Sequence, residues 1–169
     1  MWRTRRALDD AESRGAKAAH AVEEAVLALW RRAGVRCAGV EWWIGRAYTT
    51  RLPIEFHFDH DVKAGSRHPL FSSVFFFNPV RGGHLAVTDA RHGHEATRLE
   101  TVKPRRNRYA IFPGDLLHGV LDARDRTPGR ALPGPRGRLR ITLVVNFWDR
   151  RPTTVPTWSE SNLYTALAR

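Results

Sequence analysis

The feature that most constrains the fold is a long series of short β-type segments. From Val40 to Trp148, runs rich in β-branched and aromatic residues alternate with Gly, Pro, Asn and Asp. This punctuation is typical of successive strands joined by tight turns. The expected strands are Val40–Tyr48, Ile54–Phe58, Phe71–Phe77, His84–Asp89, Thr97–Val102, Tyr109–Phe112, Gly119–Asp122 and Leu139–Trp148. Because no helical segments separate them, the pattern predicts a mainly β fold, a sandwich or jelly-roll barrel, rather than an alternating α/β sheet.

Two further segments are expected not to be strands. Asp9–Ala33 is rich in Ala, Glu and Leu, and its apolar residues recur at helical spacing, which predicts one N-terminal amphipathic helix ended by Gly34. Ala123–Gly137 is rich in Arg, Pro and Gly, which predicts a long inserted loop. The expected organisation is therefore a single domain over 1–169, with a helix at 9–33, a β core at 40–149, a lid loop at 123–137 and a tail at 150–169.

Composition narrows the class of protein. A chain of 169 residues is long enough to bury a core without covalent staples. Its single cysteine, Cys37, excludes a disulfide framework and a cysteine-based zinc site. No apolar run approaches the ~20 residues of a membrane helix, and no apolar stretch follows the first arginines, so we expect no secretory signal and a reducing, cytoplasmic setting.

The net charge of +11 is unusual, and arginine supplies 25 of the 28 basic residues. Such an excess favours an anionic partner. The arginines are spread along the chain, however, so an arginine-favouring composition explains the charge equally well. Both explanations stay open.

Metal chemistry is the activity class left by the motifs. The chain has no Gly-x-Ser-x-Gly elbow and no phosphate-binding Gly-x-x-x-x-Gly-Lys loop. His57 and Asp59 are two residues apart, so on a strand they point to the same face and can present an imidazole and a carboxylate to one ion. For the isolated tripeptide, the alternative is a strand end with solvated polar groups. The neighbouring His60 and Asp61 are expected to be solvated, as is His92-Gly-His94 in its loop.

A second histidine strengthens this interpretation. His118 follows the turn at Pro113-Gly114-Asp115 and stands at the start of another expected strand. Two histidines and one carboxylate on neighbouring strands form a facial triad with open positions, an arrangement associated with non-haem Fe(II) oxygen chemistry. The alternative for His118 alone is a half-buried histidine bonded to the backbone.

The last expected strand carries an arginine among apolar residues. Strand alternation puts Arg140, Thr142, Val144 and Asn146 on one face and Ile141, Leu143, Val145 and Phe147 on the other. A buried arginine is costly without an anionic partner. A guanidinium binds a carboxylate bidentately, and the Thr142 hydroxyl can add a hydrogen bond. The alternative is an internal salt bridge with an Asp or Glu.

Together these motifs resemble the Fe(II)/2-oxoglutarate-dependent dioxygenase superfamily, in a small prolyl-hydroxylase-like form. The family pattern of His-x-Asp, distal His and Arg-x-Ser/Thr is matched by His57 and Asp59, by His118, and by Arg140 and Thr142. Gly82-Gly83-His84-Leu85 also looks like the glycine turn that many members carry between the metal motifs. One departure is that Arg140 lies 22 positions after His118 because of the inserted loop, which leaves Arg138 as an alternative to Arg140.

The resemblance implies a double-stranded β-helix of the jelly-roll or cupin-like kind. It implies Fe(II) on His57, Asp59 and His118, and 2-oxoglutarate as cosubstrate on Arg140 and Thr142. Oxygen would then be used to hydroxylate or desaturate an unactivated C–H bond, with release of succinate and CO2. The substrate would be an amino acid, a peptide, a carrier-tethered group or a natural product, and it would be anionic if the basic charge is functional. Halogenating relatives lack the carboxylate of the motif, so Asp59 favours hydroxylation over chlorination.

Two other functions remain open from the sequence. One is a cupin-like metal- or ligand-binding protein without oxygenase activity, which has no need of an Arg140/Thr142 pair. The other is an oxidative demethylase of nucleic acid, for which binding of generic DNA with a steep salt dependence would be expected.

Overall fold

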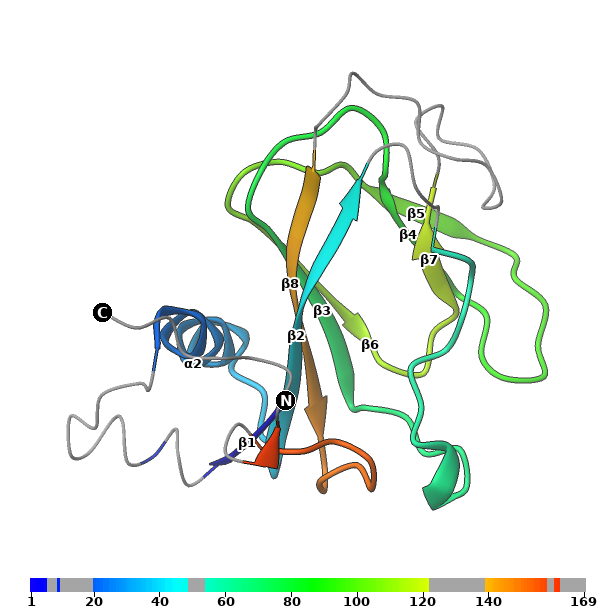
Figure 1. The fold of residues 1–169 in the computed structure, drawn as a ribbon. Helices are drawn as coiled ribbons and strands as arrows, with labels where there is room; N and C mark the ends of the chain where they lie inside the picture. Colours follow the sequence, from blue (N-terminus) through cyan, green and yellow to red (C-terminus); the bar gives the residue numbers. More distant parts are fainter. Residues whose placement is uncertain (6–8, 10–19, 49–53, 122–138, 158–159, 162–169) are drawn as a thin grey trace.

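The computed structural model describes residues 1–5, 9, 20–48, 54–121, 139–157 and 160–161. Within this part, the elements are β1 (Trp2–Thr4), α2 (Ala21–Ala33), β2 (Gly39–Tyr48), a 3-10 turn (Val62–Ala64), β3 (Phe71–Phe76), β4 (Leu85–Thr88), β5 (Leu99–Val102), β6 (Arg108–Pro113), β7 (His118–Val120) and β8 (Leu139–Trp148). The strands form two antiparallel sheets, and with one described helix the fold is mainly β, as predicted, and consistent with a sandwich or jelly roll (Figure 1).

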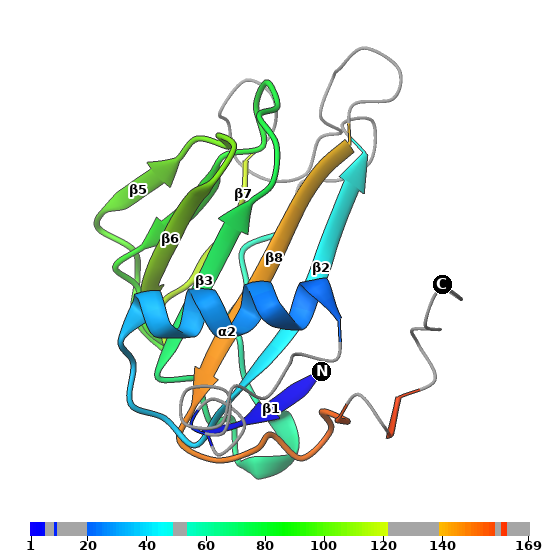
Figure 2. The ribbon, with the colours of Figure 1, turned by 90° about the vertical axis from the view of Figure 1, so that its left-hand side faces the viewer.

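Helix α2 covers one face of the larger sheet, whose strand order is β1-β2-β8-β3-β6. Figure 2 shows α2 lying across β2, β8 and β3. The buried side chains of this layer include Val26, Leu27 and Trp30 of α2 and Trp42, Leu143, Val145 and Phe147 of the sheet. The odd-numbered residues of β8 therefore face the helix, and the even-numbered ones face the opposite side. This confirms the alternation expected for the last strand.

The helix begins later than expected. His20 has extended backbone angles (φ −162°, ψ 166°), and its imidazole accepts a hydrogen bond from the Glu23 amide, so it caps a helix that starts at Ala21. The prediction of one continuous helix from Asp9 is therefore wrong. The His20 side chain caps the N-terminal end of α2, although the apolar spacing of the sequence continues before that point. Residues 10–19 lie outside the described part. The C-terminal end matches the prediction, since Gly34 is left-handed (φ 65°) and its N–H bonds to the helix carbonyls.

The smaller sheet has the order β5-β4-β7 and lies on the side of the larger sheet opposite to α2 (Figure 1). A second core fills part of the space between the two sheets. It is made of Val74, Phe76, Leu85 and Phe112, all buried. The part of the chain that the structure describes thus has three layers: a helix, a five-stranded sheet and a three-stranded sheet.

The segment expected as strand Ile54–Phe58 is extended but is not a regular strand. It contacts β7 through one isolated antiparallel bridge, in which the amides of His57 and His118 each donate to the other residue's carbonyl (2.8 and 3.0 Å). The Val120 amide adds a bond to the Ile54 carbonyl. The approach is close because a Cβ on Gly119 would lie 2.9 Å from the Ile54 oxygen. The strand assignment was wrong, but the pairing that places His57 is present.

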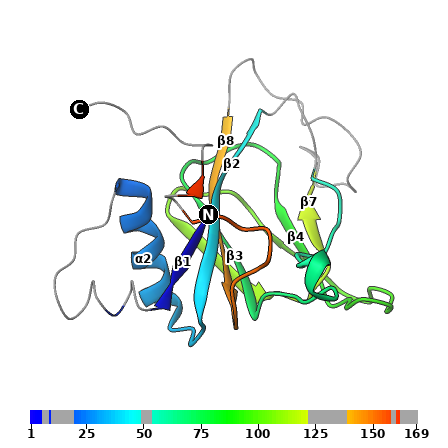
Figure 3. The same ribbon diagram turned by 60° about the horizontal axis from the view of Figure 1, so that its bottom comes forward.

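The N-terminal strand was not expected. β1 pairs with the start of β2 (Figure 3). The Trp2 side chain is buried with Trp148 and Val155. Three residues are too few to show an alternating pattern, so the sequence carries no signal for it. Among the helices of the described part, none is long and apolar enough to cross a membrane.

Candidate metal centre

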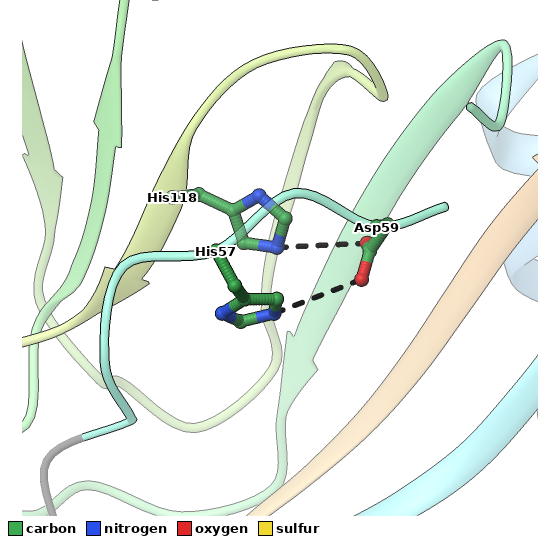
Figure 4. A group of neighbouring side chains, drawn as sticks. All are labelled: His57, Asp59 and His118. Atoms are coloured by element: carbon green, nitrogen blue, oxygen red, sulfur yellow. Dashed lines mark ion pairs between the residues drawn. The ribbon is translucent and has the colours of Figure 1, made fainter. Parts of the chain in front are cut away.

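Three predicted ligands come together at the edge of the smaller sheet. Figure 4 shows His57 and Asp59, from the extended segment, and His118, from the first position of β7, pointing toward one another. The Nε2 atoms of His57 and His118 lie 3.7 and 3.5 Å from Asp59 Oδ1 and Oδ2, respectively. One ligand atom from each residue lies within 4.8 Å of the others. This spacing allows the three groups to hold one metal ion.

The hydrogen bonds of both imidazoles leave the same nitrogen available. Nδ1 of His57 lies 2.8 Å from the Glu55 carbonyl, and Nδ1 of His118 lies 2.9 Å from the Leu116 carbonyl. A carbonyl oxygen only accepts, so in each ring Nδ1 carries a proton, and in the neutral ring Nε2 is then the nitrogen with the free lone pair. Such bonds from the outer ring nitrogen fix the orientation of metal-binding histidines.

Burial also keeps His118 in the neutral form that a metal needs. The His118 side chain is only 9% exposed. Burial lowers its pKa from the ordinary value, and this effect outweighs the opposing influence of the Asp59 carboxylate. A protonated imidazole cannot bind a metal, so a lowered pKa favours the binding form.

Asp59 is held by groups from two strands and from the segment before β3. Its Oδ2 accepts hydrogen bonds from Ser72 Oγ on β3 (2.7 Å) and from Asn146 Nδ2 on β8 (3.0 Å). Its backbone carbonyl lies 2.7 Å from Nδ1 of His68. The sequence placed Asn146 on the face of Arg140 but gave it no role. Ser72 and His68 were missed, because only the folded arrangement brings them to Asp59.

A cavity of about 560 Å³ connects this cluster to the larger sheet. Its lining comprises His57, Asp59 and His118, then Arg140, Thr142 and Val144 of β8, together with Trp43, Gly45, Arg46, Ile54, Val74, Leu85, Gly119 and Val120. Trp43 lines it whereas Trp42 packs under α2, as their opposite strand faces predict. Most of the remaining wall is aliphatic, which is usual for a small-molecule site.

Arg140 lines the same cavity and is buried, with 3% of its surface exposed. Its Nε donates to the Gly83 carbonyl (3.1 Å), and its guanidinium lies 5.1 Å from the centre of the Phe76 ring. Gly82 and Gly83 both have positive φ (74° and 65°), so the glycine turn noted in the sequence forms the acceptor. Among the described residues, no carboxylate forms an ion pair with Arg140. The alternative from the sequence, an internal salt bridge with an Asp or Glu, is therefore not found in this part of the chain.

Burial of the charged Arg140 side chain destabilises the folded protein. Burial lowers its pKa to about 10. The guanidinium is still charged at neutral pH, so the folded protein carries a buried cation whose partners among the described residues are one carbonyl and one aromatic ring. An anion entering the cavity would remove that cost.

Gly45 leaves space beside the Thr142 hydroxyl, in the cavity that Arg140 also lines. It pairs with Thr142 across β2 and β8, and a Cβ at position 45 would lie 2.5 Å from the Thr142 hydroxyl oxygen. Any other residue would push the hydroxyl aside or fill the cavity next to Arg140. The glycine therefore keeps this end of the cavity open.

The other polar residues singled out in the sequence have separate places. His60, His92 and His94 are exposed, as expected. Asp61 is not solvated but 4% exposed, because it accepts hydrogen bonds from the Thr153 amide and hydroxyl (2.8 and 2.7 Å) and ties the metal segment to the chain after β8. The expected lid loop and Arg138 lie outside the described residues.

Comparisons with known proteins add little at the level of sequence. The chain matches no protein-family model and no curated protein. Among solved structures, it is similar to a prolyl-4-hydroxylase from Pseudomonas putida, with a TM-score of 0.49 and 18% sequence identity over 86% of this chain and 79% of that one. We therefore infer function from the side chains of this chain alone.

Proposed function

We propose that the chain is an Fe(II)- and 2-oxoglutarate-dependent oxygenase. One observation carries the proposal: a cluster of two histidines and one carboxylate lines the same cavity as a buried arginine that has no carboxylate partner among the described residues. The cluster supplies ligands for a metal ion, and the arginine supplies a binding site for an acid.

The donor set suits Fe(II). Two neutral imidazole nitrogens and one carboxylate form the ligand set of non-haem Fe(II) oxygenases, which keep further positions open for small molecules. His57, Asp59 and His118 would hold the ion, since both Nε2 atoms are free of hydrogen bonds to the backbone. A cysteine-rich or all-oxygen site would favour other metals.

The other end of the cavity suits a dicarboxylic acid. Arg140 offers a charged fork, Thr142 offers a hydroxyl, and Gly45 leaves the space between them open. In the proposal, one carboxylate of 2-oxoglutarate binds Arg140 and Thr142, and its keto-acid end lies toward the metal ligands. A metal-binding cupin-like protein without oxygenase activity would gain nothing from this buried cation, which costs stability while it is unpaired.

When bound, Fe(II) and 2-oxoglutarate supply the activation of oxygen, and 2-oxoglutarate leaves as succinate and CO2. The chain itself would orient the two carboxylates of 2-oxoglutarate and exclude water from the cavity. Val74, Leu85, Val120 and Val144 contribute an apolar wall to the cavity that contains the metal ligands and Arg140. Such a wall protects a reactive centre from side reactions with solvent.

For the substrate, we propose an amino acid, a peptide, a carrier-tethered group or a natural product that is hydroxylated or desaturated at an unactivated C–H bond. Trp43, Arg46 and Ile54 are the large side chains among the described lining residues that remain for contact with it. In the same proposal, the two sheets are those of a double-stranded β-helix.

Release of labelled CO2 from 1-carboxyl-labelled 2-oxoglutarate tests the proposal without a known substrate. With Fe(II), ascorbate and air, we expect slow release by the wild-type protein and none above background by Asp59→Ala. An exposed arginine outside the metal cavity provides the control, since Arg98→Met should release CO2 at the wild-type rate. No release by the wild type, or equal release by Asp59→Ala, would contradict the proposal.

A further inference from the structure

The two carboxylate oxygens of Asp59 have different surroundings. Oδ2 accepts two hydrogen bonds, from Ser72 Oγ at 2.7 Å and from Asn146 Nδ2 at 3.0 Å. Oδ1 receives no hydrogen bond from any residue that the structure describes, and it lies 3.7 Å from Nε2 of His57. Oδ2 also lies 3.5 Å from Nε2 of His118, so each oxygen is near one histidine, but only Oδ2 is anchored by hydrogen bonds from the sheet.

The two donors are built into the sheet that faces the metal segment. Ser72 lies on β3 and Asn146 on β8, and these strands pair next to them, at Phe71 and Phe147. Both side chains are 1% exposed. A buried hydroxyl or amide without a partner destabilises the folded protein, so both donors favour the orientation of Asp59 that satisfies them.

This arrangement matters for the number of metal ligands. A carboxylate can bind a metal through one oxygen or through both. With the lone pairs of Oδ2 taken by Ser72 and Asn146, Oδ1 is the oxygen left for the ion. The protein then contributes three ligand atoms, and the positions needed by a chelating small molecule stay open.

We propose that Ser72 and Asn146 are positioning residues that restrict Asp59 to one-oxygen binding of the metal. The proposal rests on the metal-binding part of the proposed function. It adds that two strands of the five-stranded sheet, β3 and β8, determine which oxygen of Asp59 binds the ion. Neither residue touches the metal itself in this account.

The chain offers a matched control for Ser72 in the next residue. Ser73 is equally buried, on the same strand, and its hydroxyl also makes one hydrogen bond, to the Val145 carbonyl (2.6 Å). It points away from Asp59, so Ser73→Ala removes the same atoms and the same kind of bond without touching the carboxylate. Any difference between the two alanine variants reports on Asp59.

The experiment measures Co(II) affinity by calorimetry and the visible absorption spectrum of the Co(II)-loaded protein. Loss of a hydrogen-bond partner of a metal ligand typically costs about 10- to 100-fold in metal affinity. We expect losses of this size, and an altered spectrum, for Ser72→Ala and Asn146→Ala. Ser73→Ala should keep the affinity and spectrum of the wild type, and Ser72→Thr, which retains the hydroxyl, should restore both. Thermal unfolding of each variant identifies any loss caused by a damaged fold.

The possible results distinguish the positioning role of Ser72 and Asn146 from the metal site itself. If Ser72→Ala and Asn146→Ala bind Co(II) like the wild type with an unchanged spectrum, the positioning role is wrong and the metal site stands. Equal losses in the Ser72 and Ser73 variants would also overturn it, because the effect would then be one of general stability. If the wild type binds no Co(II), the metal site and the positioning role fail together.

Discussion

Replacing Arg140 by Met separates a binding role from a structural role. Methionine has a similar length and no charge, so it can fill the same space. Burial lowers the pKa of Arg140 to about 10; at 1.36 kcal/mol per pKa unit, this burial costs the unliganded protein about 3 kcal/mol. Arg140→Met removes that cost.

The substitution also removes two favourable contacts. The bond from Arg140 Nε to the Gly83 carbonyl is worth about 2 kcal/mol for a charged donor. The contact of the guanidinium with the Phe76 ring contributes about 1 kcal/mol. Gains and losses nearly cancel, so we expect the free energy of unfolding of the ligand-free protein to change by no more than about 2 kcal/mol.

Binding of 2-oxoglutarate should change far more. Truncating one partner of a buried charge pair costs about 2–5 kcal/mol. At 1.4 kcal/mol per tenfold, this corresponds to an increase in Kd of about 30- to 4,000-fold. The expected signature is a protein of nearly unchanged stability that has lost its affinity for the cosubstrate while it still binds metal.

Urea unfolding and calorimetry with Mn(II) and 2-oxoglutarate measure the two quantities on the same samples. Arg138→Met is the control, and we expect it to leave the Kd of 2-oxoglutarate within a few-fold of wild type. A large loss of stability in Arg140→Met would refute the reasoning, because the arginine would then be structural. Retained binding would refute it too, and strong loss in Arg138→Met alone would move the anion site to that residue.

Three further predictions concern other parts of the molecule. Gly45→Val should weaken 2-oxoglutarate binding in calorimetry while metal affinity stays unchanged, because the new side chain collides with the Thr142 hydroxyl; unchanged 2-oxoglutarate binding would place the acid elsewhere. Hydrogen bonds from Thr97 and from the Arg98 amide lower the pKa of Asp89 to about 2 from an ordinary 3.8. The stability advantage of wild type over Asp89→Asn should therefore be complete above pH 3.8 and disappear as the pH falls through about 2, and a pH-independent difference in urea midpoints would contradict this. If the net charge of +11 steers an anionic substrate, kcat/KM should fall several-fold as salt is raised beyond ~0.1 M, whereas a flat profile would make the charge compositional.

The last strand shows how much the sequence alone can predict. β8 is ten residues long and mostly apolar, so its alternation is unambiguous, and its bounds match the expected Leu139–Trp148. The structure places Leu143 and Val145 under the helix and Arg140 and Thr142 in the cavity, as the pattern requires. Long strands buried on both faces leave little choice of register, because a shift by one residue would bury the wrong side chains.

The elements that the sequence misjudged depend on contacts from distant parts of the chain. The His20 side chain caps the N-terminal end of α2, although the apolar spacing of the sequence continues before it. The segment around His57 is held by β7 and by Asp61, whose partner Thr153 lies 92 residues away. Ser72 carries no motif, and only the packing of β3 against the metal segment gives it a function to propose. Local patterns do not contain such long-range contacts.

Anaerobic addition of Fe(II) and 2-oxoglutarate, followed by visible absorption, tests most directly whether one cavity holds both groups. A 2-oxo acid chelated to Fe(II) gives a weak visible charge-transfer band that neither component gives alone. We predict that the band appears with wild-type protein, is absent with Asp59→Ala, and needs a much higher 2-oxoglutarate concentration with Arg140→Met. No band at saturating concentrations of both components, or an undiminished band with Asp59→Ala, would contradict the account.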